Sequence, residues 1–203
     1  MPLIHTLPDE LRALLPDALQ ALAEPVALGK GQVLFAQGAP PLALFYVVHG
    51  EVVLERAGLQ GQTVVLQRVR HGLIAEASMQ SRRYHCAGRV TLAGLAVRLP
   101  MPALTLALQG DAAFALRWIG MLNQEVRRLR AQTERLALKG VEPRLLHLIE
   151  TEGDAGALDI GSGLKVLAAQ LCVTHEALYR TVARLEAAGL VARGGGWLRL
   201  VRR

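Results

Sequence analysis

A long helical segment divides this sequence into two parts of different character. Asp111 is a residue type that caps helix N-termini, Gly140 is a typical stop signal, and Gly120 is the only glycine or proline between them. Along the segment, apolar or small residues follow one another at alternating intervals of four and three. These positions are Ala115, Ile119, Leu122, Val126, Leu129, Thr133 and Leu136. Such a heptad repeat predicts a helix that packs lengthwise against another helix.

The expected partner of this helix is the same helix of a second copy. The sequence contains no other long helical segment, and the opposite face of this one is basic. The basic residues of that face are Arg127, Arg128, Arg130 and Arg135. Pairing of identical helices would produce a homodimer. The heptad positions listed above would form its interface, and we call this row of residues the seam. The alternative is that the seam docks on the N-terminal part of the same chain.

The N-terminal part, residues 1–110, has the pattern of a compact antiparallel β-structure. Short apolar stretches alternate with glycine and proline at turn-like intervals. The expected strands are 33–36, 44–48, 51–56, 63–69, 85–90 and 94–99. A helix over 10–24, with leucines at helical spacing, is expected to cap this roll.

The C-terminal part contains a helix-turn-helix pattern. Two helical stretches, 164–171 and 174–188, are separated only by Cys172 and Val173. The small residue Ala168 lets the two helices cross closely, as the motif requires. Thr174 is able to cap the second helix, which is the recognition helix of such a motif.

A wing follows this motif. Strands are expected at 190–193 and 197–201, on either side of three consecutive glycines, 194–196. A hairpin of this kind beside a helix-turn-helix predicts a two-stranded wing.

The second helix of the motif carries side chains that are suited to reading base edges. His175, Glu176, Tyr179 and Arg180 are expected on its exposed side. A carboxylate accepts a hydrogen bond from cytosine N4, and a guanidinium binds guanine O6 and N7 together. Glu176 and Arg180 are four residues apart, so the alternative is an ordinary surface ion pair, worth about 0.3 to 0.5 kcal/mol.

The charge distribution fits a nucleic-acid partner. From residue 164 to the end there are seven Lys and Arg against two Glu, whereas residues 141–163 have one Arg against five acidic residues. A basic block of this kind suits the phosphate backbone. The residues expected to contact it are Lys165, Thr174, Arg184, Arg193 and Arg199.

Composition excludes several other classes of protein. With 52% hydrophobic residues among 203, the chain is not disordered as a whole, and no apolar run approaches the roughly 18 to 20 residues of a membrane span. The only cysteines, Cys86 and Cys172, form neither a disulfide framework nor a cysteine-held metal site. His85 and Cys86 are neighbours on an expected strand, so they point to opposite sides and cannot ligate one metal. We expect an unexported, cytoplasmic protein with no catalytic residues, metal or cofactor.

Over nearly its whole length the chain resembles the CRP/FNR superfamily of bacterial transcription regulators. Residues 29–38 and 44–52 resemble the family's cyclic-nucleotide-binding β-roll, 111–139 resembles its dimerisation helix, and 174–180 resembles its recognition-helix signature. The resemblance implies an α+β fold with an antiparallel β-roll of the double-stranded β-helix type (1–110), a dimerisation helix (111–139) and a winged helix-turn-helix (140–203). It also implies a homodimer that binds double-stranded DNA at a palindromic operator. RNA polymerase and a small-molecule effector of unknown identity are expected as further partners.

The chain departs from the family at the turn and at the first base-reading position. The family usually has arginine where this chain has His175, and glycine where it has Cys172. A residue other than glycine at that turn costs about 1 kcal/mol if its φ is positive.

The effector pocket departs further from the family. Its members that bind cyclic AMP use a Gly-Glu-Leu-type stretch and an Arg-Ser or Arg-Thr pair, which correspond to 72–79 and 81–86 here. Glu76 is retained, but the hydroxyl partner of the arginine is missing. On the long helix, Leu129 and Arg130 replace the adenine-contacting Thr-Ser pair. The residues of the candidate pocket are Glu76, Ser78, Arg82, Arg83, Leu129 and Arg130.

We therefore expect an effector other than cyclic AMP. The alternatives are a regulator that needs no effector, because its pocket is degenerate, and a sensor of a cyclic nucleotide or of haem.

Overall fold

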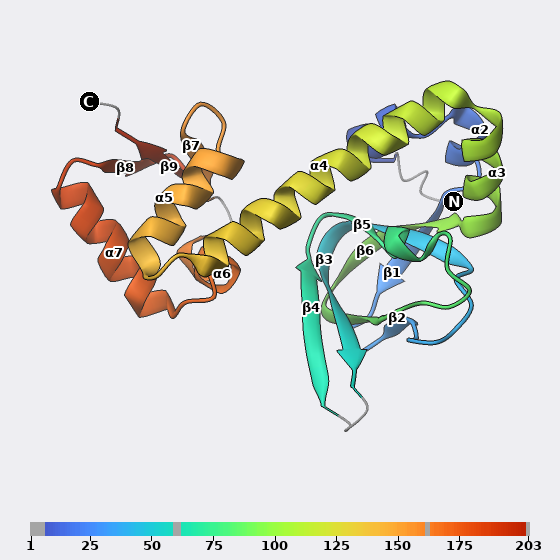
Figure 1. The fold of residues 1–203 in the computed structure, drawn as a ribbon, viewed down its shortest axis with the longest axis horizontal. Coiled ribbons are helices and arrows are strands. Elements are labelled where there is room, and N and C mark those ends of the chain that lie inside the picture. Colours follow the sequence, from blue (N-terminus) through green and yellow to red (C-terminus); the bar gives the residue numbers. More distant parts are fainter. Residues whose placement is uncertain (1–6, 59–61, 161–162, 202–203) are drawn as a thin grey trace, which may run out of the picture. The chain divides into compact units, whose positions relative to one another are not determined.

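The computed structural model describes residues 7–58, 62–160 and 163–201, which form two compact units. The first unit is Met1–Ile119 and the second is Gly120–Arg203, so the boundary between them lies within the long helix α4 (Ala112–Ala137; Figure 1). Within the described residues, no helix is both long enough and apolar enough to cross a membrane.

The first unit is an antiparallel roll. Its strands are β1 (Glu24–Leu28), β2 (Val33–Phe35), β3 (Ala43–Ala57), β4 (Thr63–Val69), β5 (Gly72–Ile74) and β6 (Ala87–Pro100). The order in the sheet is β1-β6-β3-β4, with β2 also paired to β6 and β5 to β3. A short 3-10 helix, η1 (Glu76–Ser78), follows β5. The roll predicted from the sequence is confirmed.

Two pairs of predicted strands are in fact two long bent strands. The expected strands 44–48 and 51–56 are both part of β3, and 94–99 is joined in β6 to most of 85–90. The cause is a close approach of Gly50, whose φ is +100°, and Gly94, where an added Cβ would clash with the carbonyl of His49. The pairing shifts register at this point, so the chain bends without a turn.

Aromatic packing and a buried phenol stabilise the centre of the roll. The rings of Phe35 and Tyr84 lie 4.5 Å apart between centroids. The Tyr84 hydroxyl donates to the carbonyl of Ala43 at 2.6 Å and accepts from its amide at 3.1 Å, so this buried polar group is fully bonded. Cys86 is buried here while His85 is exposed, as predicted for side chains that face opposite sides. Both residues precede β6, so the strand begins two residues later than expected.

The helices of the first unit differ from the sequence prediction in two places. The expected helix over 10–24 is divided into α1 (Asp9–Leu14) and α2 (Asp17–Gln20), because Pro16 ends the first and begins the second. Residues 101–110, assigned to the roll from sequence, form the helix α3 (Met101–Gly110). The side chain of Asp111 then caps α4 by accepting from the amide of Phe114 at 2.9 Å, as predicted.

The second unit combines the rest of α4 with a small helical and β domain. Its other elements are α5 (Val141–Glu152), β7 (Ala157–Asp159), α6 (Leu164–Gln170), α7 (His175–Ala187), β8 (Val191–Gly194) and β9 (Trp197–Leu200). The wing sheet has three strands in the order β7-β9-β8, not the two predicted, because β7, in the segment between α5 and α6, pairs with β9. Gly195 and Gly196, both at positive φ, form the hairpin turn.

Arg135 is also placed differently from the prediction. The sequence placed it on an exposed basic face of the long helix, but its side chain is buried, with 1% of its surface exposed. It forms an ion pair with Glu152 at the end of α5. Burial of a charge is tolerated here because an opposite charge meets it.

The turn between α6 and α7 stores backbone strain. Cys172 has a φ of +55°, a conformation that costs an ordinary residue about 1 to 2 kcal/mol, and its side chain is exposed.

Cys172→Gly is therefore expected to raise the free energy of unfolding by about 0.5 to 1 kcal/mol, since glycine removes the strain but gains freedom in the unfolded chain. Urea denaturation measures it. The control Cys172→Ala keeps the strain and should leave stability unchanged; equal stability of both variants would contradict the interpretation.

Candidate nucleic-acid interface and effector pocket

The helix-turn-helix is assembled by three buried side chains and one cap. Ala168 of α6, Leu171 at the turn and Leu178 of α7 are all buried where the two helices meet. The hydroxyl of Thr174 accepts a hydrogen bond from the amide of Ala177 at 3.2 Å and so caps α7. The crossing and the cap predicted from the sequence are thus confirmed.

The exposed side of α7 carries the four predicted reading residues. His175, Glu176, Tyr179 and Arg180 are all exposed, and the rings of His175 and Tyr179 lie 6.2 Å apart. In the described part of the chain, Glu176 and Arg180 form no ion pair with each other or with any other residue. The alternative of a simple surface ion pair is therefore wrong for this structure. Both charged groups are free to meet bases.

Two of the predicted backbone-contacting arginines are already paired within the domain. Arg184 of α7 forms an ion pair with Glu142 at 2.6 Å. Arg193 of the wing lies 5.8 Å above the ring of Tyr179 and 3.4 Å from the carboxylate of Glu186. Exposed pairs of this kind are worth at most about 1 kcal/mol, so a phosphate can replace the carboxylate.

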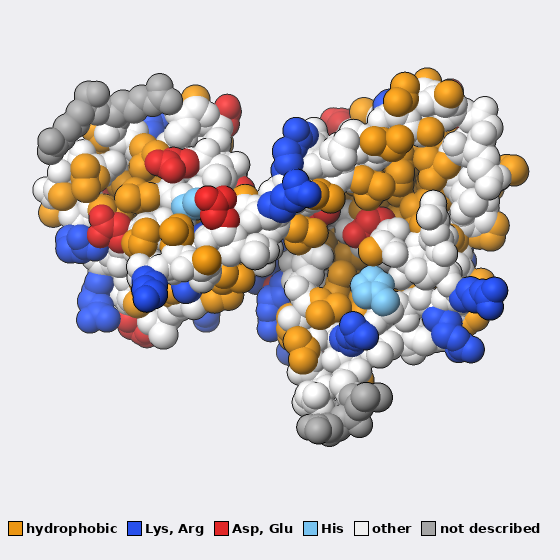
Figure 2. All heavy atoms as spheres, viewed as in Figure 1, with side chains coloured by type: hydrophobic (Ala, Val, Ile, Leu, Met, Phe, Trp, Pro, Cys, Tyr) orange, Lys and Arg blue, Asp and Glu red, His pale blue; other side chains and the backbone are white. Residues whose placement is uncertain are grey.

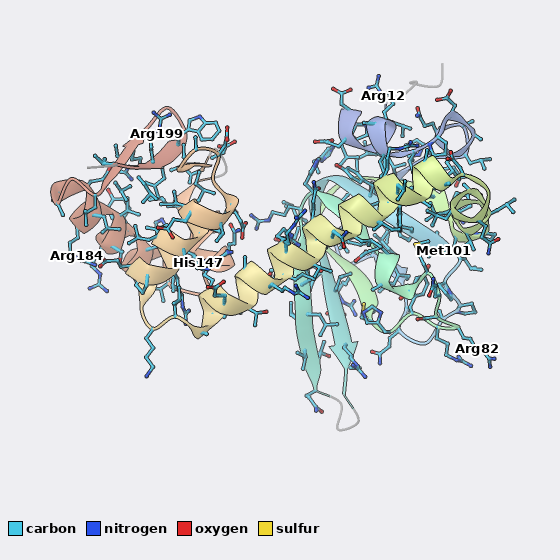
Figure 3. The ribbon with its side chains drawn as sticks, turned by 45° about the horizontal axis from the view of Figure 1, so that its top comes forward. Arg12, Arg82, Met101, His147, Arg184 and Arg199 are labelled. Carbon is cyan, nitrogen blue, oxygen red and sulfur yellow. The ribbon has the colours of Figure 1, made fainter. Side chains whose placement is uncertain are left out.

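The other predicted backbone contacts are exposed. Lys165 begins α6 and Arg199 is on the central strand of the wing sheet, whereas Arg184 extends from α7 (Figure 3). Among the described residues neither Lys165 nor Arg199 has an ion-pair partner. The basic groups thus come from α6, α7 and the wing together.

The heptad seam on α4 is largely uncovered. The exposed fractions are 52% for Ile119, 43% for Val126, 42% for Leu129 and 42% for Leu136, and Thr133 is exposed as well. Ala115 and Leu122 are half-buried. Val126, Leu129 and Thr133 line a shallow groove together with Arg130 and Glu134. Figure 2 shows Lys and Arg side chains gathered over the middle of α4.

In the roll, the predicted pocket residues are only partly brought together. Glu76 and Ser78 are in η1, and the Ser78 hydroxyl lies 3.1 Å from Nδ1 of His85. The guanidinium of Arg83 donates to the carbonyl of Gly38 at 2.8 Å. Arg82 is exposed and points away from the roll (Figure 3).

The remaining pocket residues, Leu129 and Arg130, belong to the second unit. A pocket that combines both sets therefore stays a prediction.

Two residues of this region were missed from the sequence. Ala75, directly before η1, has a φ of +74°, and its methyl group is buried in the core of the roll. The signal was present, because the family's Gly-Glu-Leu-type stretch has glycine at this place. His85 was dismissed as a metal ligand, but its contact with Ser78 could not be seen from spacing alone.

The thiol of Cys86 is unsuited to redox chemistry. Burial raises its pKa, and the nearby carboxylate of Glu76 raises it further, although Arg56 opposes the effect. The reactive species of cysteine is the thiolate, so this group is an inert part of the core.

Comparisons with known proteins agree with this geometry. Residues 25–111 match the family model of the cyclic nucleotide-binding domain. No curated protein sequence matches the chain significantly.

Solved structures match nearly the whole chain. A CooA variant from Carboxydothermus hydrogenoformans is 16% identical, with 96% of this chain and 92% of that chain covered and a TM-score of 0.65. DNR from Pseudomonas aeruginosa is 24% identical, with 96% and 91% covered and a TM-score of 0.55. CLP from Xanthomonas campestris, described as a c-di-GMP responsive global regulator, is 21% identical, with 96% and 98% covered and a TM-score of 0.53. Residues 25–111 are thus similar to a cyclic nucleotide-binding domain, and the chain as a whole shares the fold of these solved structures.

Proposed function

We propose that this protein is a homodimeric transcription regulator that binds a palindromic DNA operator and responds to an effector other than cyclic AMP. The observation that carries the proposal is the exposed side of α7, where Glu176 and Arg180 are free of partners within the described chain. A carboxylate and a guanidinium that do not bond to each other are able to form hydrogen bonds with the edges of a cytosine and a guanine, respectively.

Basic groups around α7 complete the interface. Positive charge comes from α6, α7 and both strands of the wing hairpin, through Lys165, Arg184, Arg193 and Arg199. Contacts to phosphates position a protein on the duplex without reading its sequence. Arg193 also stacks on Tyr179 and so links the wing to the recognition helix.

Arg180→Ala is expected to abolish sequence preference while most of the total binding remains. The bidentate contact to guanine would be lost, which costs about 1 to 3 kcal/mol of discrimination, whereas the phosphate contacts survive. Fluorescence anisotropy with a selected operator and with scrambled DNA, at several salt concentrations, measures both affinities. The matched control is Arg127→Ala, an exposed arginine of α4. If Arg180→Ala lowered both affinities by the same factor, it would not read bases.

The uncovered seam supports the homodimer. Ile119, Val126, Leu129 and Leu136 are each at least two-fifths exposed, which leaves a row of apolar side chains open along one helix. A two-fold dimer places one recognition helix in each of two major grooves about 34 to 36 Å apart, as a palindromic operator requires.

Leu122→Lys combined with Val126→Lys is expected to give a monomer. Both positions are near the centre of the seam, and unpaired charge buried in an interface costs several kcal/mol, so the dimer should weaken at least about a hundredfold. Sedimentation velocity measures it. Gln124→Lys, on the opposite side of the helix, is the control and should stay dimeric. A stable dimer of the double variant would refute the seam.

The geometry of the roll supports an effector other than cyclic AMP. The Arg83 guanidinium is bound to the carbonyl of Gly38, and the Ser78 hydroxyl is paired with His85. Ala75 adds a strained residue directly before Glu76. Arg83 and Ser78 are thus engaged in contacts of the roll itself, and Arg82 points away from it (Figure 3).

Cyclic AMP is therefore expected to change neither the melting temperature nor the affinity for the operator. A ligand that binds only the folded protein raises its melting temperature by mass action, so thermal scans with cyclic AMP, c-di-GMP, haem and small anions compare the candidates. A panel without any positive compound would favour a regulator that needs no effector. A tenfold gain in DNA affinity at micromolar cyclic AMP, lost in Glu76→Ala, would overturn this part of the proposal.

A further inference from the structure

One arginine joins three segments of the second unit. Arg144, near the start of α5, donates from Nε to the carbonyl of Leu138 at 2.9 Å and from Nη2 to the carbonyl of Leu136 at 3.3 Å. Its Nη1 donates to the carbonyl of Leu171 at 3.3 Å. The first two carbonyls are at the C-terminal end of α4, and the third is at the end of α6, directly before the turn of the helix-turn-helix.

The chemistry of arginine explains this arrangement. The last carbonyls of a helix have no partner within the helix, and the helix dipole makes this end negative. A guanidinium has five N–H donors in a rigid plane and a permanent positive charge, so it can bond carbonyls of two helices at once. Arg144 thereby caps α4 and α6 with the same group.

A second polar connection runs in parallel. The buried guanidinium of Arg135, on α4, pairs with one oxygen of Glu152 at the end of α5. The other oxygen of Glu152 accepts from the side chain of Gln170, on α6, at 3.1 Å. His147 of α5 adds a contact to Glu134 of α4 at 3.3 Å.

Hydrophobic packing does not replace these connections. The core of the second unit is built from α5, α6, α7 and the wing sheet, by residues such as Leu148, Leu171, Leu178 and Leu198. Among the described residues, none of α4 belongs to this cluster. The attachment of α4 to the helix-turn-helix therefore depends on polar groups, with Arg144 at its centre.

We propose that Arg144 is a positioning residue for DNA recognition, which fixes the recognition helix relative to the long helix and so sets the half-site spacing that the dimer accepts. The inference rests on the proposed function. Since α7 packs on α6 through buried Ala168 and Leu178, the bond from Arg144 to the end of α6 is transmitted to the reading side chains.

The first test measures binding as a function of operator geometry. An operator is selected with the wild-type protein from randomised DNA, and its half-sites are then moved one base pair closer together or further apart. The wild type should lose about a hundredfold in affinity at each displaced spacing. Arg144→Gln should bind the operator of best spacing about tenfold more weakly than the wild type does. At the displaced spacings the variant should lose less than about a further threefold in affinity, and its base preference within each half-site should be unchanged. A merely structural role would lower all affinities together and leave the spacing profile sharp.

Matched variants separate geometry from charge and folding. Arg127→Gln removes an exposed arginine of α4 and should keep the sharp profile. Arg144→Lys keeps the positive charge but replaces the rigid planar guanidinium by a flexible ammonium group that cannot hold all three carbonyls in the same geometry, so its profile should broaden as well. It also serves if Arg144→Gln fails to fold. Gln170→Ala, which breaks the parallel connection, should broaden the profile further when it is combined with Arg144→Lys.

The second test needs no DNA. Amide hydrogen exchange of residues 133–138 in the free protein should be at least about tenfold faster in Arg144→Gln than in the wild type, while the amides of α5 keep their protection. Unchanged exchange of this helix end would overturn the inference about Arg144. A wild type that selects no palindromic operator would instead refute the proposed function, and the exchange experiment can be interpreted in either case. A wild type with a sharp spacing optimum that Arg144→Gln shares would also overturn it.

Discussion

The uncovered apolar row along α4 is the constraint on which the rest of this protein depends. A helix with half-exposed isoleucine, valine and leucines at heptad spacing leaves apolar surface in water, and each Å² of it that is buried is worth roughly 25 cal/mol. Within neither unit does a described element cover this row. In the proposed homodimer a second copy offers the same row in return, and the two-fold symmetry of such a dimer would match a palindromic operator.

Local signals were enough to predict the helix-turn-helix and the long helix. Thr174 and Asp111 cap their helices through their own side chains, and the small Ala168 permits the helix crossing, so each feature depends on residues close in sequence. The heptad repeat likewise defined α4 before any contact was known. The strain at Cys172 was anticipated only through the family resemblance, because the family usually has glycine at this turn.

Features that depend on distant contacts were missed. The bend of β3 and β6 needs Gly50 and Gly94 to face each other across two strands, which no local pattern reveals. Arg135 appeared to be part of an exposed basic face because the sequence could not show that Glu152 meets it. In the sequence, Arg144 is a lone basic residue in an acidic stretch. Its role was missed because its partners are backbone carbonyls, which no side-chain pattern reveals, and one of them is 27 positions away.

The division into two cores determines how an effector could act on DNA binding. The hydrophobic core of the roll and that of the second unit share no residue, and α4 is the element that continues from one unit into the other. A ligand in the roll changes DNA affinity only if it binds two arrangements of the dimer differently, and this coupling is reciprocal. An attachment of α4 by directional hydrogen bonds suits such coupling, because bonds from a planar guanidinium hold one angle whereas apolar contacts tolerate sliding. The same bonds that position the recognition helix would therefore transmit a change at the seam to the operator.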